Sequence, residues 1–254
     1  MTLQFEAALL SDTGQVRPLN EDAIGMDPAA RLFVLADGLG GYKAGEIASA
    51  MAVSSILARL GQWRSVDLCE DAAFDAEAAL REAIIGINAD IYNAAANSTA
   101  YAGMATTLVV AWLLGRRLWV AHAGDSRLYR LRSERLQQIT RDHSFNQELI
   151  DAGMVTEAEA RQLPAKNLVT RALGADAELE PEIHAYDAAP GDLLLLCSDG
   201  LSEMIGKDEI AAWLATAHDD IQGAARRLVA MANQAGGCDN VSVLIVRLMA
   251  SDAA

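Results

Sequence analysis

Four aspartates of this sequence stand beside short apolar segments. They are Asp37, Asp125, Asp199 and Asp239, and the segments are residues 32–36, 118–123, 193–197 and 241–246. A short apolar run bounded by turn residues is typical of a buried strand. A carboxylate at the end of such a strand is costly unless it is paired or bound to a cation. The pattern therefore predicts a scaffold that brings carboxylates to one place.

Glu21 and Asp22 extend this set, since they end a polar turn just before another short apolar segment. Hard divalent cations prefer oxygen ligands, and Mg²⁺ takes only one or two carboxylates while keeping several waters. The alternative for any single Asp-Gly or Gly-Asp pair is an ordinary turn, the commonest use of these dipeptides. Their recurrence beside several strands favours a cation centre. The four histidines are scattered and the three cysteines widely spaced, which disfavours a zinc site built from them.

Strands and helices are expected as pairs of like elements rather than in strict alternation, which favours an α+β fold. Strands are expected at residues 5–10, 23–26, 32–36, 105–114, 117–123, 128–131, 182–186, 192–197 and 241–246. Helices are expected at residues 44–60, 71–93, 144–152, 157–163, 207–216 and 219–235. No linker or repeat divides the sequence, so residues 1–254 are expected to form a single catalytic domain.

Composition limits the class of protein and partner. Hydrophobic residues make up 52% of the 254 residues, which predicts a substantial core. The net charge of −15 argues against nucleic acid as a partner, because phosphate backbones need a basic footprint. No apolar run reaches the length of a membrane span, and the amino terminus lacks the features of a secretory signal. With an odd number of cysteines, these features predict a cytoplasmic protein without a membrane partner, and a monomer is the default expectation.

The acidic residues belong to a longer series of motifs. In chain order these are Ser11-Asp12-x-Gly14-x-x-Arg17-x-x-Asn20-Glu21-Asp22, Ala36-Asp37-Gly38-x-Gly40-Gly41, Ala44-Gly45-Glu46, Gly103-Met104-x-Thr106-Thr107, Gly124-Asp125-Ser126-Arg127, Ser198-Asp199-Gly200-Leu201 and Asp239-Asn240-Val241-Ser242. From about residue 11 to 246 this order resembles the metal-dependent Ser/Thr protein phosphatases of type 2C (PPM family), most of all their compact bacterial members. The resemblance implies a four-layer α-β-β-α sandwich. Its two central, mainly antiparallel sheets are flanked by helices, with a metal centre at one end.

The resemblance also implies a role for each matching residue. Asp37 bridges two Mg²⁺ or Mn²⁺ ions, and the Gly38 carbonyl binds one of them. Asp199 and Asp239 complete the shell of the other ion.

Around this pair of ions the resemblance implies further contacts. Glu21 reaches the second ion through water, and Asp22 holds metal-bound waters. Asp125 joins Asp199 in binding a third, weaker ion, while Arg17 grips the phosphate of the substrate. A surface salt bridge is the alternative for Arg17.

The chemistry expected of such a centre is hydrolysis of a phosphate ester. A water shared by two cations becomes a hydroxide nucleophile near neutral pH, and the cations with a guanidinium neutralise the phosphoryl oxygens. The expected substrates are phosphoserine and phosphothreonine in proteins, with a Ser/Thr kinase as the opposing partner. Two alternatives stay open: a metal-dependent phosphodiesterase or nuclease, and a catalytically inactive relative that senses phosphoproteins or metabolites.

Departure of the alkoxide calls for a general acid. Where family members carry a histidine after Asp-Gly or Gly-Gly, this sequence has Leu39 and Tyr42. His143 is the candidate acid, against the alternative that it is structural. It opens a poorly patterned excursion, residues 141–174, that resembles the family's flap. Gly153 is its expected hinge, and the flap ends at three expected anchors, Asn167, Arg171 and Gly174.

Overall fold

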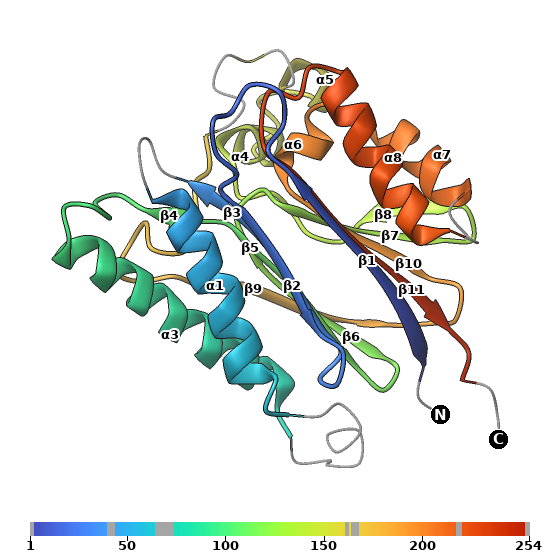
Figure 1. The fold of residues 1–254 in the computed structure, drawn as a ribbon, viewed down its shortest axis with the longest axis horizontal. Coiled ribbons are helices and arrows are strands. Elements are labelled where there is room, and N and C mark those ends of the chain that lie inside the picture. The colour runs from blue at the N-terminus through green and yellow to red at the C-terminus, as the bar shows by residue number, and fades with distance from the viewer. Residues whose placement is uncertain are drawn as a thin grey trace.

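The computed structural model describes residues 3–39, 44–63, 74–160, 163, 168–216 and 220–251. Two β-sheets lie face to face, and helices cover the outer face of each (Figure 1). The first sheet has the order β1 (Gln4–Asp12), β11 (Val241–Met249), β10 (Leu193–Cys197), β7 (Arg127–Arg132) and β8 (Arg135–Gln138). The second has the order β2 (Asp22–Asp27), β3 (Leu32–Leu39), β5 (Leu108–Leu114), β6 (Arg117–Ala123) and β9 (Glu182–Asp187), with β4 (Ala105–Thr106) also paired to β3.

The helices form the two outer layers and the flap. They are α1 (Gly45–Leu60), α3 (Ala76–Asn97), α4 (Phe145–Asp151), α5 (Glu157–Ala160), α6 (Asp199–Ser202), α7 (Lys207–Thr216) and α8 (Ile221–Gln234). Helices α1 and α3 cover the second sheet, while α7 and α8 cover the first. Every strand pairing between these elements is antiparallel. This is the α-β-β-α sandwich that the sequence predicts.

Alternation along the central strands explains why both of their faces are apolar. In β3, Leu32 and Val34 pack beneath α1 and α3, whereas Phe33 and Leu35 point into the core between the sheets. Successive strand residues point to opposite faces, so a strand covered on both sides needs apolar residues at every position. The inter-sheet core takes side chains from both sheets, among them Leu196 and Leu244.

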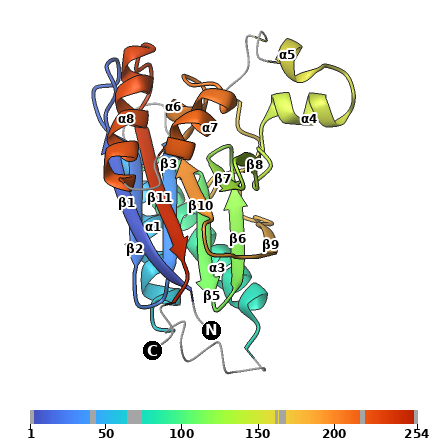
Figure 2. The same ribbon diagram turned by 90° about the vertical axis from the view of Figure 1, so that its right-hand side faces the viewer.

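The same construction carries acidic residues to one end of the sandwich. Strands β3 and β10 run toward that end and finish beside Asp37 and Asp199, while β2 and β11 start there beside Asp22 and Asp239. Antiparallel pairing places the end of one strand beside the beginning of its neighbour. The flap with α4 and α5 stands over this end of the molecule (Figure 2).

The element boundaries differ from the predicted ones in a few places. Helix α3 begins at Ala76 because Asp75 caps it, its side chain accepting a hydrogen bond from Ala78 N at 3.0 Å. The predicted start at residue 71 lies outside the described residues. Strand β8 and helix α6 were not predicted, since each has only four residues and no clear apolar period. None of the described helices is both long enough and apolar enough to cross a membrane.

Candidate metal centre

The acidic residues meet where the two sheets end. Asp22 and Asp37 are register partners on neighbouring strands β2 and β3. Asp199 opens the short helix α6 directly after β10, and Asp239 lies two residues before β11, the neighbour of β10. The Asp37 carboxylate interacts electrostatically with Asp22, Asp199, Asp125 and Asp239. The sandwich thus gathers carboxylates from both sheets.

The backbone of Asp37 is fixed by two threonines. Thr107 Oγ1 accepts a hydrogen bond from Asp37 N at 2.9 Å, and Thr107 N donates to Asp37 O at 2.8 Å. Thr106 Oγ1 donates to the same carbonyl at 2.8 Å. Thr107 Oγ1 is also 2.7 Å from Ser126 Oγ, beside Asp125. One buried hydroxyl therefore links the strand that carries Asp37 to the loop that carries Asp125.

Burial dominates the electrostatics of the cluster. Burial first, and then neighbouring carboxylates, raise the pKa of Asp37 and of Asp199 well above its ordinary value. Burial raises the pKa of Asp22 to about 6, and burial with the nearby Asp142 raises that of Asp125 to about 7. Asp22 Oδ1 is buried and has no hydrogen-bond partner. Carboxylates in this state suit divalent cations, which remove both the desolvation and the repulsion that disfavour ionisation.

Arg17 lies at the open side of the cluster. Its Nη2 donates to Asp239 Oδ2 at 2.7 Å, and half of its side chain remains exposed. This hydrogen bond raises the pKa of Arg17, and the charges of Asp239, Glu21 and Asp199 act in the same direction. A guanidinium that is anchored to one carboxylate and still exposed is available to an incoming phosphate.

Asn240 organises the loop that carries Arg17 and Glu21. Its Nδ2 donates to Thr13 O at 2.9 Å and Leu19 O at 2.8 Å, while its Oδ1 accepts from Glu21 N at 2.8 Å. Asn240 belongs to the motif Asp239-Asn240-Val241-Ser242, but no role was predicted for it. Its position beside Asp239 was the available signal, because Asn side chains commonly hold turns through backbone hydrogen bonds.

Ser198 plays a similar part on the other side of the centre. Its Oγ donates to Asp22 Oδ2 at 2.9 Å and accepts from Ser242 N at the same distance. Hydrogen bonds to the carboxylate favour its ionised form and oppose the effect of burial on the pKa of Asp22. Nothing in the spacing of Ser198 distinguished it from a residue that merely precedes a turn.

Two glycines allow helix α1 to start directly against the centre. A Cβ on Gly38 would collide with backbone atoms of Gly45 and Glu21, and a Cβ on Gly45 would lie 2.8 Å from Glu21 Oε1. Burial and the neighbouring Glu46 raise the pKa of Glu21. Any larger residue at either glycine would push Glu21 away from the other acids.

His143 lies near the start of the flap. It is 9% exposed, its Nε2 is 3.3 Å from Glu182 Oε2, and its ring stacks on His122. Burial, aided by the charges of His122 and Arg171, lowers its pKa to about 4. A histidine that is neutral at pH 7 holds no imidazolium proton to give, so these surroundings favour a positioning role over the predicted general acid. Leu39 ends β3, and Tyr42 lies outside the described residues.

Three of the expected flap residues lie in the described part of the chain. Gly174 has a φ of 82° and donates through its N–H to Asn88 Oδ1 at 2.8 Å, which fixes the end of the flap to α3. Arg171 Nη1 donates to Glu180 O at 3.2 Å. Gly153 has a φ of 67°, which suits a tight turn after α4. Asn167 lies outside the described residues.

Comparison with known proteins finds relatives that match most of the chain. The family model described as Protein phosphatase 2C matches residues 15–233. The chain is 38% identical over 252 residues to the serine/threonine protein phosphatase PstP of Mycobacterium tuberculosis, a match that covers 99% of this chain and 46% of PstP. The chain thus spans about half the length of that relative.

Shorter relatives match along their whole length. The protein phosphatase PhpP of Streptococcus pneumoniae is 37% identical, with 98% of this chain and 100% of PhpP covered. The crystal structure of the catalytic domain of PstP in complex with two manganese ions superimposes with a TM-score of 0.85 at 36% identity, covering 98% of this chain and 100% of that one. In fold and in sequence, the chain belongs to the protein phosphatase 2C family.

Proposed function

We propose that this protein is a Mg²⁺- or Mn²⁺-dependent phosphatase that hydrolyses phosphoserine and phosphothreonine in proteins. The observation that carries the proposal is the set of buried carboxylates drawn from both sheets, with raised pKa values and Arg17 at their open side. Membership of the protein phosphatase 2C family supports the same activity. Phosphorylated proteins are the substrates of Ser/Thr phosphatases, the class to which the named relatives belong.

Seven residues are proposed to hold the ions. They are Glu21, Asp22, Asp37, Gly38, Asp125, Asp199 and Asp239. When bound there, two divalent cations supply a water of lowered pKa and neutralise phosphoryl oxygens. We assign the catalytic roles to Asp37, as the central carboxylate, and to Arg17.

The chain's own residues then bind and orient the substrate. Arg17 can turn its exposed face to two phosphoryl oxygens while Asp239 keeps its position, which suits the fork geometry of a guanidinium. Asn240 holds the loop that carries Arg17, so phosphate contact requires little reordering of the backbone. His143 stays a candidate general acid, with the lowered pKa counting against it.

The test compares substrate classes under defined metal conditions. We expect hydrolysis of p-nitrophenyl phosphate and of a phosphothreonine peptide with Mn²⁺, loss of both in excess EDTA, and recovery when Mn²⁺ is restored. Activity that survives chelation would contradict the proposal. A bis-ester substrate, bis(p-nitrophenyl) phosphate, distinguishes the phosphodiesterase or nuclease alternative, and absence of hydrolysis of all three substrates would favour an inactive sensor.

We further propose that residues 1–254 act as one catalytic domain with residues 141–174 as its flap, and that the protein is a cytoplasmic monomer opposing a Ser/Thr kinase. One chain supplies every carboxylate of the centre, so no second copy is needed to complete it. Cys197 and Cys238 are free thiols, as a reducing compartment allows. Light scattering of the purified protein tests the monomer, and a dimer at micromolar concentration would contradict it.

A further inference from the structure

The first residues of the flap form hydrogen bonds with the loop that carries Asp125. His143 N donates to Gly124 O at 2.9 Å, and Gly124 N donates back to His143 Nδ1 at 3.1 Å. One flap residue therefore satisfies both backbone groups of the residue that precedes Asp125. Gly124 has a φ of 110°, and a Cβ there would press on Thr107. The loop is thus held by Thr107 on one side and by His143 on the other.

A second contact of the same kind lies one residue along on the flap. Arg127 Nε donates to Asp142 Oδ1 at 2.9 Å, and Arg127 Nη2 donates to Asp142 Oδ2 at 2.5 Å. Gln138 Nε2 also donates to Asp142 Oδ1 at 2.8 Å. Asp142 and His143 together hold the segment 124–127 from both ends, with the buried Asp125 between them.

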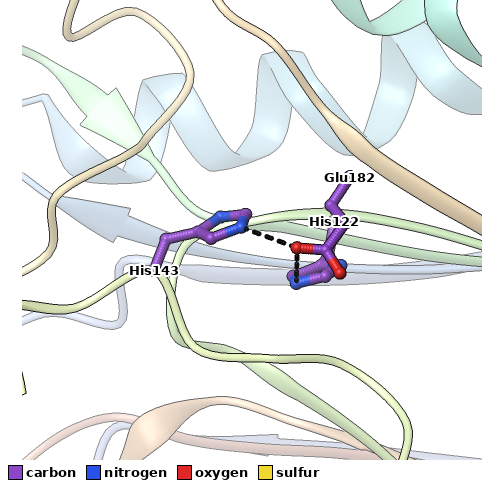
Figure 3. Close-up of side chains that lie close together, drawn as sticks. All are labelled: His122, His143 and Glu182. Atoms are coloured by element: carbon purple, nitrogen blue, oxygen red, sulfur yellow. Dashed lines mark hydrogen bonds and ion pairs between the residues drawn. The ribbon is translucent and has the colours of Figure 1, made fainter. Parts of the chain in front are cut away.

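The Glu182 carboxylate lies close to the Nε2 atoms of both His122 and His143 (Figure 3). A backbone N–H can only donate, so His143 Nδ1 is the acceptor for Gly124 N, while His143 Nε2 lies 3.3 Å from Glu182 Oε2 and 3.1 Å from Arg171 Nη1. His122 Nε2 lies 2.8 Å from Arg141 O and 3.3 Å from Arg141 N, so the backbone of Arg141 holds this second ring. Glu182 therefore orients His143 from the side opposite to Gly124.

His122, His143 and Glu182 could otherwise suggest a site for a metal, since their ligand atoms lie within 4.8 Å of one another. The geometry is poor for that use. The rings are nearly parallel, 8° apart with centroids at 4.7 Å, so the in-plane lone pairs cannot converge on one ion. Coordination through both Nε2 atoms would also break their contacts with Arg141 and Arg171.

We propose that His143 is a positioning residue that sets the affinity of the Asp125 carboxylate for a divalent cation, through its paired hydrogen bonds to Gly124. The inference rests on the proposed function, because it assumes that Asp125 binds such an ion. It also gives the flap a physical connection to the acidic centre, since His143 O accepts from Thr170 N at 2.9 Å, near the far end of the flap.

Two substitutions at His143 test the contacts of Nδ1 and of Nε2 separately. His143→Asn keeps an acceptor at the position of Nδ1, and with it the bond from Gly124 N, but loses the contact with Glu182. His143→Gln keeps a polar group near the position of Nε2 and loses the acceptor for Gly124 N. His184→Gln is the matched control, since His184 is an exposed histidine that also contacts Glu182.

The readout is Mn²⁺ binding by isothermal titration calorimetry and by electron paramagnetic resonance of free Mn²⁺. The Mn²⁺-binding step that is lost in Asp125→Asn is the one assigned to the ion held by Asp125, and is called the Asp125 step. We expect His143→Gln to weaken that step about 10-fold, as for other outer-shell partners of metal ligands. We expect His143→Asn and His184→Gln to stay within about twofold of wild type, and the Asp125→Asn/His143→Gln double variant to bind like Asp125→Asn alone.

Three results would overturn the inference: an unchanged Asp125 step in His143→Gln, equal weakening in His143→Asn, or an Asp125→Asn protein that loses no binding step. Stoichiometric Zn²⁺ binding that needs His122 and Glu182 would replace the inference by the metal-site alternative. Thermal unfolding of each variant excludes simple misfolding. Wild-type protein without phosphatase activity would mean failure of the proposed function, whereas an active wild type with an unchanged His143→Gln step would mean failure of this inference alone.

Discussion

Two regions of this molecule bury aspartates, and they treat them in opposite ways. Asp192, at the start of β10, is 1% exposed, and Arg132 neutralises it through Nε to Oδ1 at 2.5 Å and Nη2 to Oδ2 at 2.6 Å. At the other end of the same strand, Asp199 lies among further carboxylates, which together with burial raise its pKa. A buried charge with its own arginine serves the fold. Buried acids that repel one another mark a place prepared for an ion from outside the chain.

The acidic end gives the largest expected effect. Replacing the central carboxylate by Asp37→Asn should lower kcat at saturating Mn²⁺ by about 1000-fold, equivalent to about 4 kcal/mol, because the site would lose the carboxylate proposed to hold both ions. The assay is hydrolysis of a phosphothreonine peptide. Asp90→Asn, an exposed acid paired with Arg59, is the matched control and should keep wild-type kcat. A loss of kcat of less than tenfold in Asp37→Asn would show that Asp37 is not the central metal ligand.

At the other end of β10, where Asp192 pairs with Arg132, a substitution should lower the stability of the protein rather than its activity. Arg132→Met leaves Asp192 buried without its arginine, and we expect a loss of about 2–4 kcal/mol in the free energy of unfolding. Chemical denaturation measures this loss. Arg59→Met breaks a pair that is exposed on both sides and should cost less than about 0.5 kcal/mol. Equal losses in the two variants would erase the distinction between the regions.

The third prediction concerns pH in the absence of divalent cations. The pKa values of Asp22 and Asp125 are raised to about 6 and about 7, so the folded protein binds more protons than the unfolded chain between about pH 4 and pH 7. Stability from these groups is complete below their unfolded pKa and is lost as pH rises through the folded pKa.

In EDTA, the melting temperature should therefore rise by roughly 3–10 °C from pH 8 to pH 6. Differential scanning calorimetry measures the melting temperature, and adding Mn²⁺ at pH 8 should raise it again. A melting temperature that falls over the same interval would show that other groups dominate.

The smallest effect is expected at Arg17. Arg17→Ala should raise KM for a phosphopeptide about 10-fold with a smaller change in kcat, since the guanidinium contacts the ground-state phosphate as well as the transition state. Arg17→Lys should recover only part of the loss, because an ammonium lacks the fork geometry. Steady-state kinetics at saturating Mn²⁺ give both constants, and an unchanged KM would leave Arg17 as a salt bridge to Asp239.

The α+β class and the acidic end could be predicted from strong local patterns, whereas the four-layer sandwich was predicted from the resemblance to the type 2C phosphatases. Strand β3 was recognisable because its apolar residues end abruptly at Asp37 and glycines follow. Helix α6 and strand β8 escaped prediction because four residues show no period, and pairing with distant neighbours decides their structure. Other features could not be predicted because they depend on contacts between residues more than fifteen positions apart, which the spacing in a single sequence does not reveal. These are the roles of Ser198 and Asn240 and the hydrogen bonds between His143 and Gly124.

One measurement tests the contrast between the two regions most directly: thermal unfolding of wild type, Asp37→Asn and Asp192→Asn in EDTA and in Mn²⁺. If the acidic end is prepared for cations, Asp37→Asn raises the melting temperature in EDTA by relieving repulsion and removes most of the gain that Mn²⁺ gives wild type. Asp192→Asn should lower the melting temperature in both conditions and keep the Mn²⁺ gain. An Asp37→Asn protein that is destabilised in EDTA as much as Asp192→Asn, and still stabilised by Mn²⁺ like wild type, would contradict this account.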